Sequence, residues 1–385
     1  MAGRAPRRGV VVSAIGITQT LAWASTYYLT AVFTDAVSAD LRLSRTWFYG
    51  GVSAALLLSG LLGPVAGRLI DRHGGRNVLA ATNLVFAAGL VLLASASGPW
   101  TLVAAWLVLG VGMGFGLYEA AFATVAGLYG GEARGAITGI TLFAGFASTV
   151  GWPLSTALID HFGWRAALLG WAALHVLVGL PLNRLLVPQS ARPAAVAATG
   201  AAPSGTPWTM IVLAGVFGAT WFVSTALAAH LPRLLEAIGA TPAAAVAAGA
   251  LVGPAQVAAR LAEFSMLRQA TPLFSARLAA GLHPVGAVLL AAVGAPAAIA
   301  FVLLHGAGNG LLTIARGTLP LALFGPAGYG LRTGLLAAPA RILQGAAPLL
   351  FGLVLDRGGP AAALLLTGSL TGLSLLALLL LRPAR

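Results

Sequence analysis

Two strongly apolar segments are joined by the short stretch Gly67-Arg68-Leu69-Ile70-Asp71-Arg72-His73-Gly74-Gly75-Arg76-Asn77-Val78-Leu79. This connection combines four charged side chains with three glycines, although the segments on both sides are almost entirely apolar. A charge in the middle of a bilayer is costly, so charged residues gather where the chain leaves the membrane. The stretch therefore predicts a tight loop between two membrane-spanning helices.

The composition independently indicates a membrane protein. The chain is 59% hydrophobic and 8% charged, with a mean hydropathy of +0.92, whereas a soluble domain carries about a quarter charged residues. Its 50 glycines and 21 prolines lie inside apolar runs and form no repeat, which excludes collagen and disorder. There is no cysteine, which excludes disulfides and thiolate metal sites. The basic residues behind the +13 net charge are too dispersed for a nucleic-acid-binding face.

Apolar segment lengths predict the number of spans. A bilayer core of ~30 Å requires about 20 apolar residues in a helix. Twelve segments meet this measure: 10–33, 47–70, 77–96, 100–128, 135–159, 165–187, 208–231, 243–265, 275–293, 296–322, 332–355 and 360–381. The first follows a short basic arm and shows no small-residue cleavage site, so we expect it to be retained. The predicted fold class is an all-α membrane protein with twelve transmembrane helices.

The chain divides into two halves that resemble each other. Residues 188–207 are rich in Pro, Ala, Gly, Ser and Thr and predict a cytoplasmic linker between six-helix bundles at 1–187 and 208–385. Leu158-Ile159-Asp160-His161-Phe162-Gly163 at the end of span five is echoed by Val354-Leu355-Asp356-Arg357-Gly358 at the end of span eleven. Two pseudo-symmetric bundles around a shared central site are typical of secondary transporters.

The arginines predict the orientation. The termini and the connections on their side hold most of them, including Arg4, Arg68, Arg72, Arg76, Arg192 and Arg268. The opposite connections hold fewer arginines, and acidic residues such as Asp40, Asp160 and Asp356 balance them. The positive-inside rule then places both termini in the cytoplasm, and we expect a multi-pass protein of a bacterial-type inner (plasma) membrane.

The 67–79 stretch resembles the signature loop of the major facilitator superfamily, Gly-x-Leu-x-Asp-Arg-x-Gly followed by basic residues between helices two and three. The matching positions are Gly67, Leu69, Asp71, Arg72, Gly74, Gly75 and Arg76, with Gly75 where a basic residue is usual. The resemblance implies the major facilitator fold and transport by alternating access. It also implies a gate formed by Gly67, Asp71, Arg72, Gly74 and Arg76, which clamps the cytoplasmic side when the carrier faces outward.

Five charged residues stand out inside the predicted spans, away from their ends: Glu119, Arg260, Glu263, Arg316 and Arg341. A mid-bilayer charge costs at least ~2.5–3.5 kcal/mol and normally faces a cavity or a partner. Arg260 and Arg341 lie ~12–13 Å along their helices from arginines at the membrane edge. Because guanidinium is planar, permanently charged and bidentate toward carboxylates, these two predict a clamp for a small organic anion.

A branch of the same superfamily sharpens this expectation. The stretch from Gln256 to Arg260 resembles the arrangement of monocarboxylate transporters, in which an acidic or polar residue precedes an arginine by a three-residue gap. This implies that Gln256 and Arg260 bind the substrate carboxylate. Gln256 replaces the usual acidic residue, which weakens proton coupling by this route. Oxalate/formate antiporters carry a second basic residue in span eleven, where Arg341 falls.

Each of these charges also has a structural interpretation. Arg260 can pair with Glu263 one turn away, as part of a degenerate second copy of the signature loop. Arg341 can bond to carbonyls at a helix break, and Arg316 can extend toward the cytoplasmic surface. Glu119 is either a proton-coupling carboxylate or the charge partner of an arginine from the other half, and Glu263 carries the same two options.

Polar residues of the first span supply further candidates. Gln19, Trp23 and Tyr27 recur at i, i+4 and i+8 and share one helix face. We expect Gln19 and Tyr27 to face the substrate, together with Asn83 and Asn309. The alternative is a Trp/Tyr belt at the membrane interface.

The combined interpretation is a secondary active transporter for a small solute, with an organic anion as the expected substrate and protons or a counter-anion as candidate coupling ions. The chain has no lysine and therefore no nucleotide-binding Gly-x-x-x-x-Gly-Lys loop. No catalytic motif is present, so we expect no enzyme activity, no cofactor and no metal. We expect a monomer in the lipid bilayer without nucleic acid.

Two other functions stay open at this stage. One is efflux of drugs or toxic oxyanions, although drug/proton antiporters resemble one another in a span-four arginine motif that 107–110 lacks. Residues 145–153 match their span-five Gly-Pro motif only loosely. The other is a transporter-like sensor or scaffold, which would usually add a sizeable soluble domain that this sequence does not predict.

Overall fold

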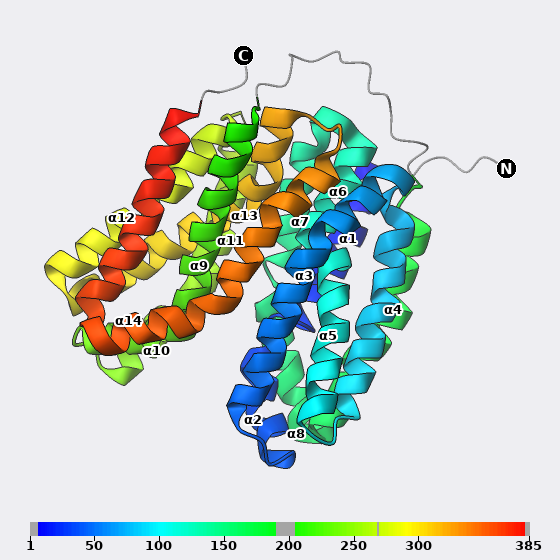
Figure 1. The fold of residues 1–385 in the computed structure, drawn as a ribbon, viewed down its shortest axis with the longest axis horizontal. Coiled ribbons are helices and arrows are strands. Elements are labelled where there is room, and N and C mark those ends of the chain that lie inside the picture. Colours follow the sequence, from blue (N-terminus) through cyan, green and yellow to red (C-terminus); the bar gives the residue numbers. More distant parts are fainter. Residues whose placement is uncertain (1–6, 190–204, 268, 382–385) are drawn as a thin grey trace. The chain divides into compact units, whose positions relative to one another are not determined.

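The structure, a computed structural model, describes residues 7–189, 205–267 and 269–381. These residues are helical, with no strand among them (Figure 1). They form two compact units, residues 1–199 with 325–338 and residues 200–324 with 339–385. Most of the predicted linker, residues 190–204, lies outside the described part.

The first unit contains α1 (Arg8–Ala24), α2 (Thr30–Asp40), α3 (Arg45–His73), α4 (Gly75–Ala94), α5 (Pro99–Gly116), α6 (Tyr118–Tyr129), α7 (Arg134–Ala144) and α8 (Ala147–Leu174). Two π-helical segments, His175–Gly179 and Leu182–Leu186, extend α8. The second unit contains α9 (Pro207–Ala237), α10 (Pro242–Ala250), α11 (Val252–Ser265), α12 (Pro272–Val293) and α13 (Ala298–Phe324). The long helix α14 (Tyr329–Leu380) starts in the first unit and continues in the second from Pro339.

Eight helical stretches of the described residues are long and apolar enough to cross a membrane. Two of these stretches, Pro99–Leu186 and Tyr329–Leu380, are far longer than one span and break at internal turns. The first predicted span is divided into α1 and α2 by a turn at residues 25–29. With these breaks, the helices of the described part correspond to the twelve predicted spans. Large apolar side chains such as Leu61, Leu177 and Leu365 are exposed on their surfaces, as lipid contact requires.

The internal repeat has a physical basis in two glycine turns. Gly163 (φ 80°) divides α8, and Gly359 (φ 69°) divides α14. Each glycine follows an aspartate, Asp160 or Asp356, by three residues, and glycine is the residue that adopts positive φ without steric cost. The turning residue of the second copy is therefore Gly359, one position beyond the Gly358 that sequence comparison aligns with Gly163.

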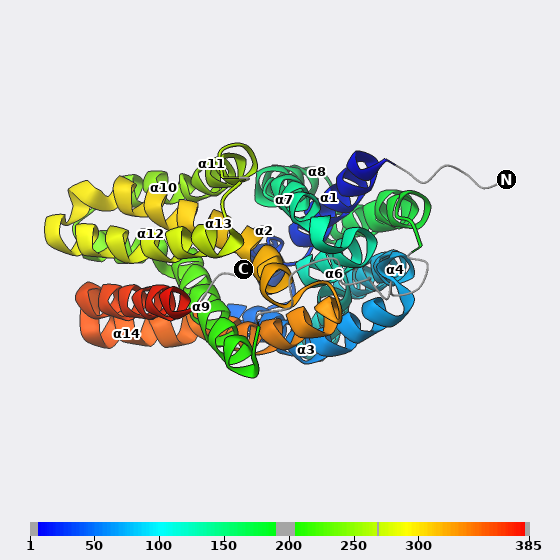
Figure 2. The ribbon, with the colours of Figure 1, turned by 90° about the horizontal axis from the view of Figure 1, so that it is seen from above.

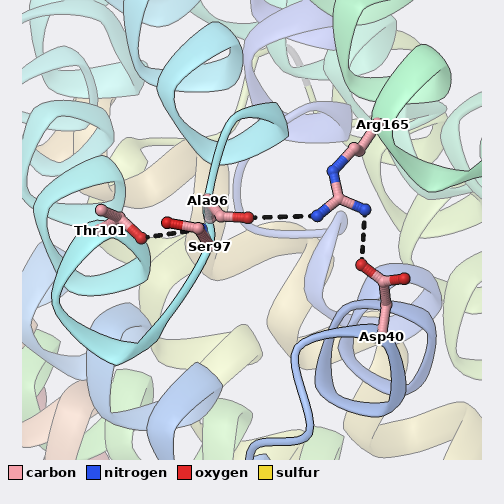
Figure 3. A network of polar contacts seen from close by, with 5 residues as sticks. All are labelled: Asp40, Ala96, Ser97, Thr101 and Arg165. Carbon is pink, nitrogen blue, oxygen red and sulfur yellow. Dashed lines mark hydrogen bonds and ion pairs between the residues drawn. The ribbon is translucent and has the colours of Figure 1, made fainter.

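Ion pairs link the connections at the predicted outer side of the first unit. Arg165 donates to Asp40 Oδ2 at 2.5 Å and to the Ala96 carbonyl at 3.2 Å, while Thr101 Oγ1 accepts from the Ser97 amide at 3.0 Å (Figure 3). In the second unit Arg233 pairs with Asp356. The acidic residues of these connections therefore neutralise neighbouring arginines, although half-exposed pairs contribute little stability.

Glycines set the distance between helices in both units. In the first, α3 lies alongside α5 (Figure 1), and a Cβ on Gly110 would lie 2.8 Å from Ala55 Cα and from Ala55 O. In the second, α12 lies alongside α13 (Figure 2), and a Cβ on Gly308 would lie 2.8 Å from Ala279 O. Small residues allow this approach of backbones, which drives helix association in lipid.

We predict that Gly110→Ala lowers the melting temperature of the purified protein, because the added methyl meets backbone atoms that cannot rotate away. Overpacking of this kind costs about 1–3 kcal/mol. Gly127→Ala on α6 is the matched control, since a Cβ there meets nothing within 4 Å, and its helix propensity raises stability by up to about 1 kcal/mol. Equal melting temperatures for both variants would contradict the glycine contact.

Candidate functional site

Asp71 caps the first turn of α14 inside the first unit. Its Oδ1 accepts from the Gly330 amide and its Oδ2 from the Leu331 amide, each at 2.9 Å. The first amides of a helix have no intrahelical acceptor and carry the positive end of the helix dipole. A carboxylate in this position therefore satisfies two amides and places a negative charge where the dipole favours it.

The glycines of the signature stretch make this cap possible. A Cβ on Gly67 would lie 2.0 Å from Gly330 O, and a Cβ on Gly330 would lie 2.6 Å from Gly67 O and 2.8 Å from Asp71 Oδ1. One turn further along α14, a Cβ on Gly334 would lie 2.4 Å from Gly63 O. The backbones of α3 and α14 are thus in contact over two turns, and any larger residue would separate the carboxylate from its amides.

The remaining predicted gate residues lie at the junction of α3 and α4. Gly74 has φ 78° and joins α3 to α4. A Cβ on Gly75 would lie 1.7 Å from Thr124 Oγ1, which explains why the basic residue usual at this position is absent. Arg72 is exposed and Arg76 is half-buried. The gating role of these residues stays a prediction.

Two arginines of the second unit stack on one indole. Arg316 of α13 has its Cζ 4.4 Å from the ring centre of Trp221 on α9, and Arg341 of α14 has its Cζ 4.3 Å from the same ring. The two guanidinium carbons are therefore no farther apart than the sum of these distances. Trp221 is 6% exposed and Arg341 2% exposed, and Arg341 Nη1 also donates to Gln344 Oε1 at 3.2 Å. A desolvated cation–π contact contributes ~2 kcal/mol.

Arg260 of α11 contacts α13 at Thr313. Its Nη2 lies 3.4 Å from both Gln256 Oε1 and Thr313 Oγ1, and the side chain is buried. A Cβ on Gly310 would lie 2.5 Å from Gln256 O, so this glycine brings α11 close enough for the contact. Asn309, which is half-buried, precedes Thr313 by one turn on the same face of α13.

The two glutamates of the spans differ in their surroundings. Glu263 is 1% exposed, and its Oε2 accepts from Ser275 Oγ at 2.8 Å. Glu119 is half-buried in the first turn of α6, where a negative charge is favoured by the helix dipole.

The predicted face of the first span lies in an aromatic cluster of the first unit. Gln19 is buried and donates to Gly116 O at 2.6 Å. The Trp23 ring lies 5.6 Å from the Tyr27 ring and 4.9 Å from the Tyr118 ring. Trp23 is 8% exposed and Tyr27 half-buried.

The described contacts join some of the predicted residues and not others. Arg260 contacts Gln256, as expected, and Thr313 of α13. Arg341 shares Trp221 with Arg316, so its described contacts involve different residues from those of Arg260. Trp221 was missed by sequence reasoning, because a tryptophan in an apolar helix has no distinguishing spacing.

We predict that Asp71→Asn destabilises the protein by about 1 kcal/mol, as loss of a helix N-cap does, because the amide keeps one acceptor oxygen and loses the charge. Thermal unfolding measures the change. Arg72→Gln is the control, since this exposed residue lies next to Asp71 and its replacement should change stability by less than about 0.5 kcal/mol. A melting temperature of Asp71→Asn equal to wild type would exclude the cap.

Comparisons with known proteins agree with this architecture. The family model described as Major Facilitator Superfamily matches residues 15–304. A stretch of 136 residues is 32% identical to the uncharacterized MFS-type transporter Rv1250 of Mycobacterium tuberculosis and covers 35% of this chain. The stretch spans only 23% of that relative's length.

Solved structures of transporters share the fold over nearly the whole chain. The human organic anion transporter MFSD10 (TETRAN) superposes with a TM-score of 0.75 at 17% identity, covering 97% of this chain and 100% of that one. FucP, a transporter in the outward conformation, gives 0.75 at 14% identity, covering 97% and 99%. The proton:xylose symporter XylE gives 0.72 at 14% identity, covering 96% and 94%. At such identities the likeness shows the fold alone.

Proposed function

The chain belongs to the major facilitator superfamily, and we propose that it is a secondary active transporter whose substrate is a small organic anion. The family and the structural neighbours make it a multi-pass membrane transporter and not an enzyme. Transporters of this family bind small-molecule substrates, so the proposal concerns the charge of the substrate and the residues that hold it.

The stacking of Arg316 and Arg341 on Trp221 is the observation that supports an anion. A guanidinium carries its N–H donors along the edges of its plane. A carboxylate binds to such an edge in bidentate fashion. The indole thus holds two cations near each other in a buried place, where together they attract an anion.

The charge balance of the spans supports the same substrate. The predicted spans hold three arginines away from their ends, Arg260, Arg316 and Arg341, but only two acidic residues, Glu119 and Glu263. Even with both carboxylates ionised the spans keep an excess positive charge, which is costly in a bilayer. A bound anion removes this excess. Arg260 with Gln256, and Asn309 on α13, are proposed as further substrate contacts, as are Gln19 and Tyr27 of the first unit.

Two further points fit this proposal. The human structural neighbour is named an organic anion transporter, although the likeness to it is one of fold. Lipophilic cations, the usual cargo of drug exporters, would meet the same excess positive charge, which disfavours the drug-efflux alternative. Inorganic oxyanions satisfy the arginines as carboxylates do, so export of a toxic oxyanion is the second candidate.

The Asp71 cap is the proposed cytoplasmic gate. Its bonds to Gly330 and Leu331 anchor the start of α14, and this helix continues into the second unit. Breaking the cap would free α14 to move during alternating access. We further propose that the protein is a monomer in a bacterial-type inner membrane, with both termini and the 188–207 linker in the cytoplasm.

We predict that a small carboxylate raises the melting temperature of wild type and raises that of Arg341→Gln by about half as much or less at the same concentration. A ligand that binds only the folded state stabilises it by ~2.7 kcal/mol at a hundredfold excess over its dissociation constant. Loss of one charged hydrogen bond, about 1.5–3 kcal/mol, weakens binding about tenfold or more. The panel contains carboxylates, inorganic oxyanions and lipophilic cations.

Matched variants separate binding from folding in this experiment. Trp221→Leu, which removes the ring, should lose most of the stabilisation, whereas Trp221→Phe should keep part of it. Arg357→Gln removes an exposed arginine and should respond like wild type. Stabilisation by cations alone, or an equal response of Arg341→Gln, would exclude the anion site. A response to oxyanions without carboxylates would select the second candidate.

A further inference from the structure

The amide of Gln19 on α1 is only half satisfied by the protein. The residue is 1% exposed, and its Nε2 donates to Gly116 O at 2.6 Å. Its Oε1 is buried and accepts no hydrogen bond from the described residues. The opposite orientation of the amide would place Oε1 against Gly116 O, so this contact fixes which atom lacks a partner. A buried acceptor without a donor is costly and uncommon in native proteins.

The hydroxyl groups near Gln19 are used elsewhere. Thr18 and Thr20, its neighbours in the chain, each donate to a backbone carbonyl of α1 at 3.0 Å. Thr82 of α4 lies beside Gly116, where a Cβ would be 2.4 Å from its Cγ2, and donates to a carbonyl of its own helix at 2.6 Å. A hydroxyl has a single proton. The described part of the chain therefore supplies no donor for Gln19 Oε1.

Gln19 also lies beside the interruption of a span. Leu117 has an extended backbone (φ −86°, ψ −166°) and separates α5 from α6. Gln19 binds Gly116 directly before this interruption, and Trp23, one turn further along α1, has its ring 4.9 Å from the ring of Tyr118 directly after it. Interrupted helices of transporters are where ligands bind. The position of the unsatisfied oxygen therefore points to a ligand.

The surroundings of Gln19 favour an uncharged donor. The rings of Trp23, Tyr27 and Tyr118 offer apolar surface, and none of the described contacts of Gln19 is to a carboxylate. An ammonium group would add positive charge to spans that already hold an excess of arginines away from their ends, which is costly in a bilayer. A hydroxyl group donates a hydrogen bond without adding charge.

We propose that Gln19 Oε1 accepts a hydrogen bond from a hydroxyl group of the transported solute, so that the substrate is a small hydroxycarboxylate. This inference rests on the function proposed above, in which arginines bind the carboxylate, and it adds the uncharged group that the substrate carries. An analogue without the hydroxyl leaves Gln19 Oε1 unsatisfied. A site built to bind a hydroxyl group rejects such an analogue for this reason.

Pairs of carboxylates that differ by one hydroxyl group test the proposal: lactate and propionate, 3-hydroxybutyrate and butyrate, malate and succinate. Thermal titration of the purified protein gives a dissociation constant for each compound. We expect wild type to bind the hydroxy acid of at least one pair about tenfold or more tightly. Gln19→Leu, which removes the acceptor at similar size, should bring the ratio of the two constants close to one. Thr20→Val removes a neighbouring hydroxyl that has its own carbonyl partner and should keep the ratio.

The ratio is taken within each variant, so a general loss of stability does not alter it. Equal binding of both members of every pair by wild type would overturn the hydroxyl assignment and leave the anion site intact, even if Gln19→Leu does not fold. A tenfold ratio kept in Gln19→Leu would also overturn the assignment. Failure of every carboxylate to bind would instead overturn the proposed function, and this inference with it.

Discussion

A charge buried in an apolar span must be compensated, and this constraint explains the most unusual features of the structure. The Arg341 side chain on α14 is almost completely buried. In a membrane span an uncompensated charge costs at least ~2.5–3.5 kcal/mol. The indole of Trp221 and the amide of Gln344 offset part of this cost. In our account a transported anion is a further partner of this arginine, and the buried positive charge makes the site selective for negatively charged solutes.

The same constraint acts at the ends of the helices, where backbone amides rather than charged side chains compensate a buried charge. The half-buried Asp71 carboxylate is tolerated because two backbone amides of α14 donate hydrogen bonds to it. That arrangement depends on Gly67 and Gly330, which let two backbones touch. Glycines thus have two separate functions in this chain: they allow close helix contacts, and at Gly163 and Gly359 they allow the turns that divide long helices into spans.

The fold could be predicted from the sequence because it depends on segment length and on one loop. Twenty apolar residues cross a bilayer whatever their detailed contacts, and the 67–79 stretch carries family-specific spacing. The turn at 25–29 could not be predicted, since it contains no glycine or proline, and its contact from Ser25 to His175 joins residues far apart in the sequence. The glycine at position 75 could not be explained from the sequence either, because the side chain that excludes a larger residue there is Thr124 of a distant helix.

The candidate site was predictable only in part. Buried arginines are conspicuous in apolar segments, so Arg260 and Arg341 could be selected by composition alone. Their partners could not, because Trp221, Thr313 and Gln344 are ordinary residues whose relevance comes from packing between distant helices.

Uptake of a radiolabelled carboxylate into proteoliposomes preloaded with the same unlabelled compound tests the central claim most directly. This counterflow requires binding and alternating access but no coupling ion. Our account predicts that at least one small carboxylate accumulates with wild type, and that accumulation is abolished in Arg341→Gln but kept in Arg357→Gln. Counterflow of a neutral or cationic solute, with no carboxylate transported, would contradict the account.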